Sequence, residues 1–135
     1  WQLLRIGYPM PAGWLSGGIF AWRTSGKSLQ TLTQWTVWEL RERLNGTEGV
    51  EILDVRQPGE WAEGHIPGAR FVTGSELPTR YKEIDNQKEV AVICGSGYRS
   101  SVAASFLAHH GYGHVVNVLG GMSAWKEARL PIKKN

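Results

Sequence analysis

The sequence predicts an α/β fold in which a central parallel sheet is flanked by helices on both faces. Short runs that are apolar throughout alternate along the chain with segments of helical periodicity. Such runs are typical of strands buried on both faces of a parallel sheet, and the alternation is typical of βα units. Ligands of these folds bind beyond the carboxyl ends of the strands, so the residues that follow the strands are the candidates for function.

The first part of the pattern lies between residues 36 and 72. Thr36 can cap a helix whose apolar Val37, Leu40 and Leu44 share one face, and Asn45-Gly46 would end it. Further along we expect a buried strand at 50–55, a turn-rich segment at 57–69 with a short helix around 60–63, and a second strand at 69–72.

The second part lies between residues 90 and 128. VAVIC (90–94) is the most apolar run and predicts a central strand that ends at Cys94. A helix is expected at 100–110, with Gly111 as its stop and with these residues facing inward: Val102, Ala103, Phe106 and Leu107. A strand at 115–118 and a helix at 122–128 complete the pattern, so the residues alone predict four strands.

Size and composition bound the function classes. The 135 residues and 15.0 kDa suit one ordinary domain, with 41% hydrophobic and 20% charged residues. The net charge of +3 comes without a long basic run, so we expect no nucleic-acid partner. No stretch of about 18 apolar residues is present, so we expect no membrane partner. Because the chain begins at Trp1, we expect it to be part of a longer protein.

The chain contains one cysteine, Cys94. A lone cysteine cannot form an internal disulfide or a multi-cysteine metal site. We therefore expect a reducing, cytoplasmic setting, no metal and no other cofactor. His109, His110 and His114 have no carboxylate or cysteine partner at ligand spacing, and we interpret them as solvated residues at a helix end.

The segment after the most apolar strand is suited to stabilise a negative charge. Gly95 and Gly97 can adopt positive φ and turn successive backbone N–H groups toward a common centre. The helix that follows, with Arg99 and Ser100 in its first turn, adds further N–H donors. A thiolate on Cys94 would then have a lowered pKa and be nucleophilic at neutral pH. The residues alone leave a second interpretation open, in which Cys94 is an inert buried side chain.

Several short motifs occur in an order that resembles the rhodanese domain family. They are LDVR (53–56), EW (60–61), GHIPGA (64–69), CGSGYRS (94–100), GY (111–112) and VLGGMSAW (118–125). The resemblance runs from about residue 32 to residue 132, so we expect a rhodanese domain at 32–135. It implies a central parallel sheet of about five strands and sulfur transfer through a cysteine persulfide.

The resemblance also implies the site. Cys94 falls on the sulfur-carrying cysteine, and the substrate-binding loop comprises Gly95, Ser96, Gly97, Tyr98, Arg99 and Ser100. The related phosphatase and arsenate reductase alternative uses five residues between cysteine and arginine. Only four separate Cys94 from Arg99, and the tighter loop suits a terminal sulfur better than a phosphoryl group, as the resemblance implies.

We therefore expect a sulfurtransferase whose partners are a small sulfur donor and a thiol acceptor. Cys94 would take sulfur from thiosulfate or a low-molecular-weight persulfide and, without a second cysteine, pass it to an external thiol or to cyanide. Arg99 is the only cation of the loop, so we expect weak use of dianionic thiosulfate and better use of a thiol persulfide. The alternative hypothesis is a module that senses persulfide or binds a protein without turnover.

Four residues near the site are expected to support its architecture: Asp54, Arg56, Glu60 and His65. Arg56 is expected to pair with Glu60, and Asp54 with backbone or arginine groups. His65 is expected to be a hydrogen-bonded loop residue rather than a general base, because an ionised thiol needs no strong base.

Residues 1–31 hold no complete βα unit, but they contain a repeat. LSGGIFAWR (15–23) matches VLGGMSAWK (118–126) at a constant offset of 103 residues, which takes Gly18 to Gly121. A repeat at domain-length spacing indicates two copies of one domain, although a chance match around Gly-Gly is the alternative. We expect residues 1–31 to be the end of a preceding rhodanese-like repeat or a linker. The resemblance permits a tandem protein that also carries a metallo-β-lactamase-fold hydrolase.

Overall fold

The computed structural model describes residues 12–46 and 49–134. The chain divides into two compact units, residues 1–31 and residues 32–135. The second unit holds the sheet and all but one of the described helices. Within the described residues, no helix is both long and apolar enough to cross a membrane.

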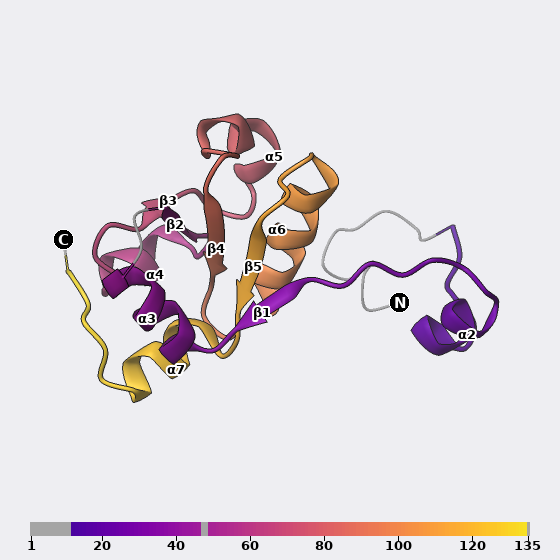
Figure 1. Cartoon of the computed structure of the whole chain (residues 1–135), viewed down its shortest axis with the longest axis horizontal. Coiled ribbons are helices and arrows are strands. Elements are labelled where there is room, and N and C mark those ends of the chain that lie inside the picture. The colour runs from indigo at the N-terminus through magenta and orange to yellow at the C-terminus, as the bar shows by residue number, and fades with distance from the viewer. Residues whose placement is uncertain (1–11, 47–48, 135) are drawn as a thin grey trace. The chain divides into compact units, whose positions relative to one another are not determined.

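The core of the second unit is a five-stranded sheet, and every strand pairing in it is parallel (Figure 1). The strand order is β1-β5-β4-β2-β3. Their bounds are β1 Thr33–Trp35, β2 Val50–Asp54, β3 Arg70–Phe71, β4 Glu89–Ile93 and β5 Val115–Val118. The expected parallel α/β fold is confirmed. The strand that the residues did not predict is β1, a three-residue edge strand with two exposed positions.

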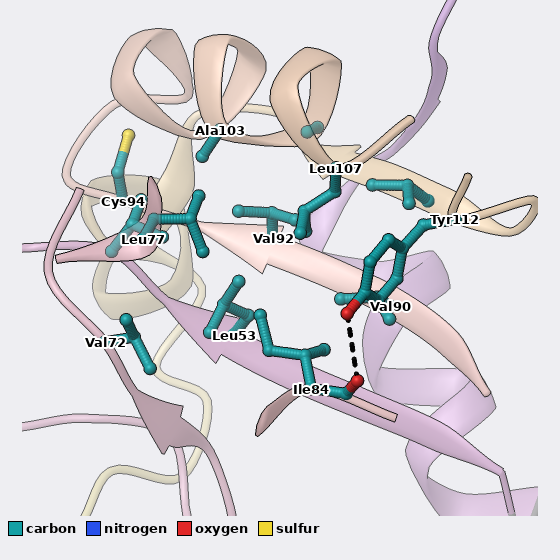
Figure 2. Packing of buried hydrophobic residues seen from close by; sticks show 13 residues of the cluster. Leu53, Val72, Leu77, Ile84, Val90, Val92, Cys94, Ala103, Leu107 and Tyr112 are labelled. Carbon is teal, nitrogen blue, oxygen red and sulfur yellow. Dashed lines mark hydrogen bonds between the residues drawn. The ribbon is translucent and has the colours of Figure 1, made fainter. Parts of the chain in front are cut away.

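Helices cover both faces of the sheet. On one face α5 (Leu77–Arg80) and α6 (Tyr98–His109) pack on alternate strand residues such as Val90 and Val92. On the other, α3 (Val37–Gly46) and α7 (Gly121–Glu127) pack on the intervening residues such as Ala91 and Ile93. Figure 2 shows the first of these clusters, with Cys94 at the end remote from Tyr112. Burial on both faces explains why the central strands are apolar throughout.

The expected cap of α3 is present. Glu39 N donates to Thr36 Oγ1 at 3.2 Å, and Thr36 N donates to the Glu39 carboxylate at 2.7 Å. Such a reciprocal pair satisfies two N–H groups that the helix itself leaves free. Residues 73–88, for which the sequence predicted no element, contain α5 and a short 3-10 helix, η1 (Tyr81–Glu83).

The inward face of α6 differs from the prediction at one residue. Ala103 and Leu107 are buried and Phe106 is half-buried, but Val102 is 61% exposed. The buried face instead runs through Ser100, Ala103, Ala104 and Leu107. Since successive residues are about 100° apart around a helix, Val102 lies roughly opposite the centre of this face and falls on the solvent side. The expected inward position of Val102 is wrong.

Candidate active site

Cys94 follows β4 directly and lies at the carboxyl edge of the sheet. The chain then turns through Gly95 and Ser96 to Gly97, which has φ +97 and precedes the first residue of α6. Cys94 has no exposed surface. Two hollows elsewhere on the surface, one lined by Tyr81–Asn86, His110 and Tyr112 and the other by residues 50–51, 68–70, 85 and 88, do not include it.

The Cys94 sulfur accepts hydrogen bonds from two sides. Gly97 N lies 3.2 Å from Sγ, and Ser100 Oγ lies 3.4 Å from it. Burial raises the pKa of the Cys94 thiol. The hydrogen bonds of the Ser100 side chain and of the Ser100, Ser96 and Gly97 backbone outweigh that effect, so the pKa falls below its ordinary value. The loop therefore favours the thiolate, the nucleophilic form.

The N-terminus of α7 holds this loop from the other side. Met122 N donates to Cys94 O at 2.7 Å, and Ser123 N donates to Gly95 O at 2.9 Å. Because these two carbonyls bond to α7, the N–H groups of the loop are free to turn toward the sulfur. A Cβ at Gly121 would lie 2.3 Å from Cys94 O, so only glycine fits there. The sequence signal for this contact is Gly120-Gly121, which the motif pattern places in the family resemblance and in the repeat but not against the cysteine loop.

A second contact that the sequence did not predict lies beneath Ser100. Ser100 Oγ donates to Asn117 Oδ1 at 2.6 Å, and both residues are buried. Asn117 lies on β5, whose other residues are all valine. Since a serine hydroxyl carries a single proton, Asn117 and the Cys94 sulfur compete for it. The available signal was one polar residue in an otherwise apolar strand.

Arg99 extends from the first turn of α6 and forms a two-pronged ion pair with Glu60. Arg99 Nη1 and Nη2 lie 2.7 and 2.8 Å from the two Glu60 carboxylate oxygens. The hydrogen bond from Arg99 lowers the pKa of Glu60 to about 2. The expected ion pair between Arg56 and Glu60 is wrong, because Arg56 Nη1 donates to the Glu60 backbone carbonyl at 2.9 Å. Glu60 belongs to α4 (Pro58–Ala62), whose position brings its carboxylate toward α6.

Arg56 is instead the partner of Asp54, and both side chains are buried. Arg56 Nη2 lies 2.7 Å from Asp54 Oδ2 and also donates to Gly64 O at 2.8 Å. Together with the bond to the Glu60 carbonyl, these contacts tie the end of β2 to the middle of α4 and to the turn that follows it. Asp54 and Arg56 thus position Glu60 and make no described contact with the sulfur.

The remaining predicted residues lie around this centre. His65 is buried, stacks on Trp61 with ring centroids 3.6 Å apart, and makes a 3.2 Å Nδ1 contact with Trp61 O. Tyr98 is 78% exposed at the start of α6. Among the hydrogen bonds of the described residues, the Ser100 hydroxyl reaches the sulfur and the Ser96 hydroxyl does not.

Comparison with known proteins identifies relatives of this chain. A family model described as a rhodanese-like domain matches residues 36–128. A protein of Allochromatium vinosum named sulfurtransferase is 42% identical over 93 residues, which cover 69% of this chain and 87% of that protein. The thiosulfate sulfurtransferase GlpE of Pseudoalteromonas translucida is 32% identical over 81 residues, covering 60% of this chain and 77% of that protein.

A solved structure shows the same arrangement of elements. The crystal structure of a rhodanese-related protein from Thermoplasma volcanium is similar to this chain with a TM-score of 0.71 and 32% sequence identity. The similarity covers 76% of this chain and 99% of that one.

Proposed function

The chain belongs to the rhodanese-like domain family, and on that premise we propose that it transfers sulfane sulfur through a persulfide on Cys94. The observation that carries the proposal is the setting of the Cys94 sulfur, which sits among hydrogen-bond donors that favour its thiolate. The relatives named sulfurtransferase support sulfur transfer in general. The donor, the acceptor and the residue roles below are our proposal.

In the first half-reaction the Cys94 thiolate attacks the outer sulfur of the donor. With thiosulfate, the S–S bond of the donor breaks, a new S–S bond forms on Cys94, and sulfite leaves with the electron pair. With a low-molecular-weight persulfide, R–S–SH, the leaving group is the thiolate R–S⁻. The N–H of Gly97 and the hydroxyl of Ser100 bond to Sγ and stabilise the attacking thiolate. With thiosulfate the negative charge then passes to the outer sulfur of the Cys94 persulfide.

In the second half-reaction an external nucleophile removes the outer sulfur. Cyanide takes it as thiocyanate, or a thiol takes it as a persulfide, and the Cys94 thiolate is restored. The chain has no second cysteine to take the sulfur as an internal disulfide. A lone reactive thiol also suits a reducing, cytoplasmic setting.

Mass spectrometry of the intact protein tests this proposal. After incubation with thiosulfate or glutathione persulfide, we expect the wild type to gain one sulfur atom and to lose it on addition of cyanide. Cys94→Ser is the matched variant and should gain none. Wild-type protein that takes no sulfur from either donor would contradict the proposal.

A second candidate is a module that holds persulfide without turnover. The observation that favours it is the complete burial of Cys94, because a donor reaches the sulfur only after the loop or its neighbouring side chains move. Steady-state formation of thiocyanate separates the two functions. Repeated turnovers per protein molecule support the enzyme, and a single sulfur taken up without turnover supports the module.

We also propose that residues 1–31 are the end of a preceding rhodanese-like repeat. Helix α2 (Gly18–Thr24) begins and ends 103 residues before α7 (Gly121–Glu127), which is the offset of the sequence repeat. Gly17 and Gly120, which precede the two helices, have φ of +75 and +69. A tandem rhodanese, with or without a metallo-β-lactamase-fold domain, would account for this repeat. Residues 32–135 expressed alone should unfold at the same urea midpoint as the whole chain. A much lower midpoint for the shorter chain would show that the two units fold as one.

A further inference from the structure

The Glu60–Arg99 ion pair lies directly over the loop that surrounds the Cys94 sulfur. A Cβ built on Gly95 would come 3.0 Å from Arg99 Nη2 and 3.5 Å from Glu60 Oε1. The carboxylate is therefore as much a part of the surroundings of the loop as the guanidinium is. Glu60 also accepts a hydrogen bond from Gln57 N at 3.1 Å, which fixes it at the start of α4.

The pair removes most of the positive charge that a donor would meet. Arg99 is the only cation among residues 94–100, and both of its terminal nitrogens bond to Glu60. Arg56, the next arginine held near the loop, is paired with buried Asp54. With a pKa of about 2, Glu60 stays ionised throughout the pH range of an assay. Each of these two arginines is thus balanced by a carboxylate.

We infer that Glu60 sets the donor preference of this site by neutralising Arg99. Sulfur donors with little negative charge beside the transferred sulfur are then favoured over dianionic thiosulfate. The inference rests on the proposed sulfur transfer through Cys94. The favoured class is a neutral thiol persulfide. Cys94–S⁻ and R–S–SH then give Cys94–S–SH and R–S⁻, with one S–S bond broken, one formed, and the proton carried with the sulfur.

The physical reason is electrostatic. A sulfonate group brought to the loop approaches the Glu60 carboxylate as closely as it approaches Arg99, so repulsion offsets attraction. A donor without a sulfonate charge is not repelled by the Glu60 carboxylate, and its binding is not weakened by the pairing of Glu60 with Arg99. Glu60 therefore acts through Arg99 and is a positioning residue that determines specificity.

Two donors that differ by one charge provide the test. Thiosulfate is a dianion and methanethiosulfonate a monoanion, and both deliver one sulfane sulfur to form the same Cys94 persulfide. The measurement is kcat/KM for thiocyanate formation with each donor, expressed as the ratio of thiosulfate to methanethiosulfonate.

In Glu60→Gln the amide oxygen can still accept the Gln57 hydrogen bond, while the negative charge is lost. We expect the ratio to rise by about fivefold or more, as for removal of one charge near a partly exposed site. Arg99→Gln leaves Glu60 unbalanced and should lower the ratio. Glu83→Gln is the matched control, since Glu83 lies on η1, which precedes the opposite end of β4, and pairs with Arg80 at the end of α5. It should leave the ratio unchanged.

The outcomes separate this inference from the function on which it rests. If Cys94 takes no sulfur from either donor or from glutathione persulfide, the proposed function is wrong. If both donors load Cys94 but the ratio is the same in wild type, Glu60→Gln and Arg99→Gln, the transfer stands and the role of Glu60 is overturned. A ratio that shifts equally in Glu83→Gln would also overturn it, because the effect would then come from overall charge.

Discussion

The contact between α7 and the cysteine loop can be tested by replacing Gly121 with alanine. The new Cβ would lie 2.3 Å from Cys94 O, with the Gly95 carbonyl carbon and oxygen at 2.8 and 2.9 Å. All three are backbone atoms, so relief requires the loop and the helix to separate. That separation lengthens the hydrogen bonds from Met122 N and Ser123 N.

The expected loss of stability has two parts. An L side chain at the Gly121 φ of +53 costs roughly 1–2 kcal/mol. The two weakened hydrogen bonds add about 1 kcal/mol each. We therefore expect Gly121→Ala to lower the free energy of unfolding by about 3–4 kcal/mol. Gly111→Ala is the matched control, because Gly111 has φ +89 but no atom within 4 Å of its would-be Cβ. It should lose only the roughly 1–2 kcal/mol of backbone strain.

Urea unfolding measures the loss of stability in both variants. The rate of persulfide formation on Cys94 reports whether the N–H groups of the loop still surround the sulfur. Gly121→Ala should load sulfur more slowly than Gly111→Ala, since the N–H groups of its loop no longer converge on the sulfur. Equal losses of stability in the two variants would refute the reasoning, because the close approach of α7 would then contribute nothing beyond the strain of a positive φ.

The pH at which iodoacetamide alkylates Cys94 at half its maximal rate should move in opposite directions in two variants. Ser100→Ala removes a donor to the thiolate and should raise this pH. Asn117→Val removes the competing acceptor for the Ser100 proton and should lower this pH. Equal shifts in one direction would contradict the competition between Asn117 and the sulfur. Arg56→Met leaves a buried carboxylate without its partner and should cost about 3–5 kcal/mol in urea unfolding. Arg80→Met, which breaks exposed pairs, should cost far less than Arg56→Met, and a similar loss in both would argue against a special role of the buried pair.

The elements that the sequence predicted well are those with strong local signals. The apolar run that became β4, the Thr36 cap of α3 and the positive φ of Gly111 each depend on neighbours within a few residues. Edge strand β1 was missed because three residues, two of them exposed, carry no periodicity. Its strand conformation depends on β5, whose Val116 pairs with Thr33 more than eighty positions away.

Pairings between charged side chains were the least predictable part of the site. Arg56 lies four residues from Glu60, and local spacing favoured that pair. The folded chain instead places the Glu60 carboxylate beside Arg99, thirty-nine residues along the chain, and turns Arg56 inward to Asp54. Short spacing is a weak guide outside helices, because the strand end and turn between the partners set the direction of each side chain.

By itself the sequence determined the fold class, the position of Cys94 at the end of a buried strand and the glycine loop that follows it, because hydrophobic periodicity and backbone freedom are local properties. Only the tertiary structure decided what surrounds the sulfur. It brought α7 against the loop carbonyls, Asn117 beneath Ser100, and Glu60 onto Arg99. These contacts join residues far apart in the chain, and they exist only because parallel strands bring their carboxyl ends to one edge of the sheet.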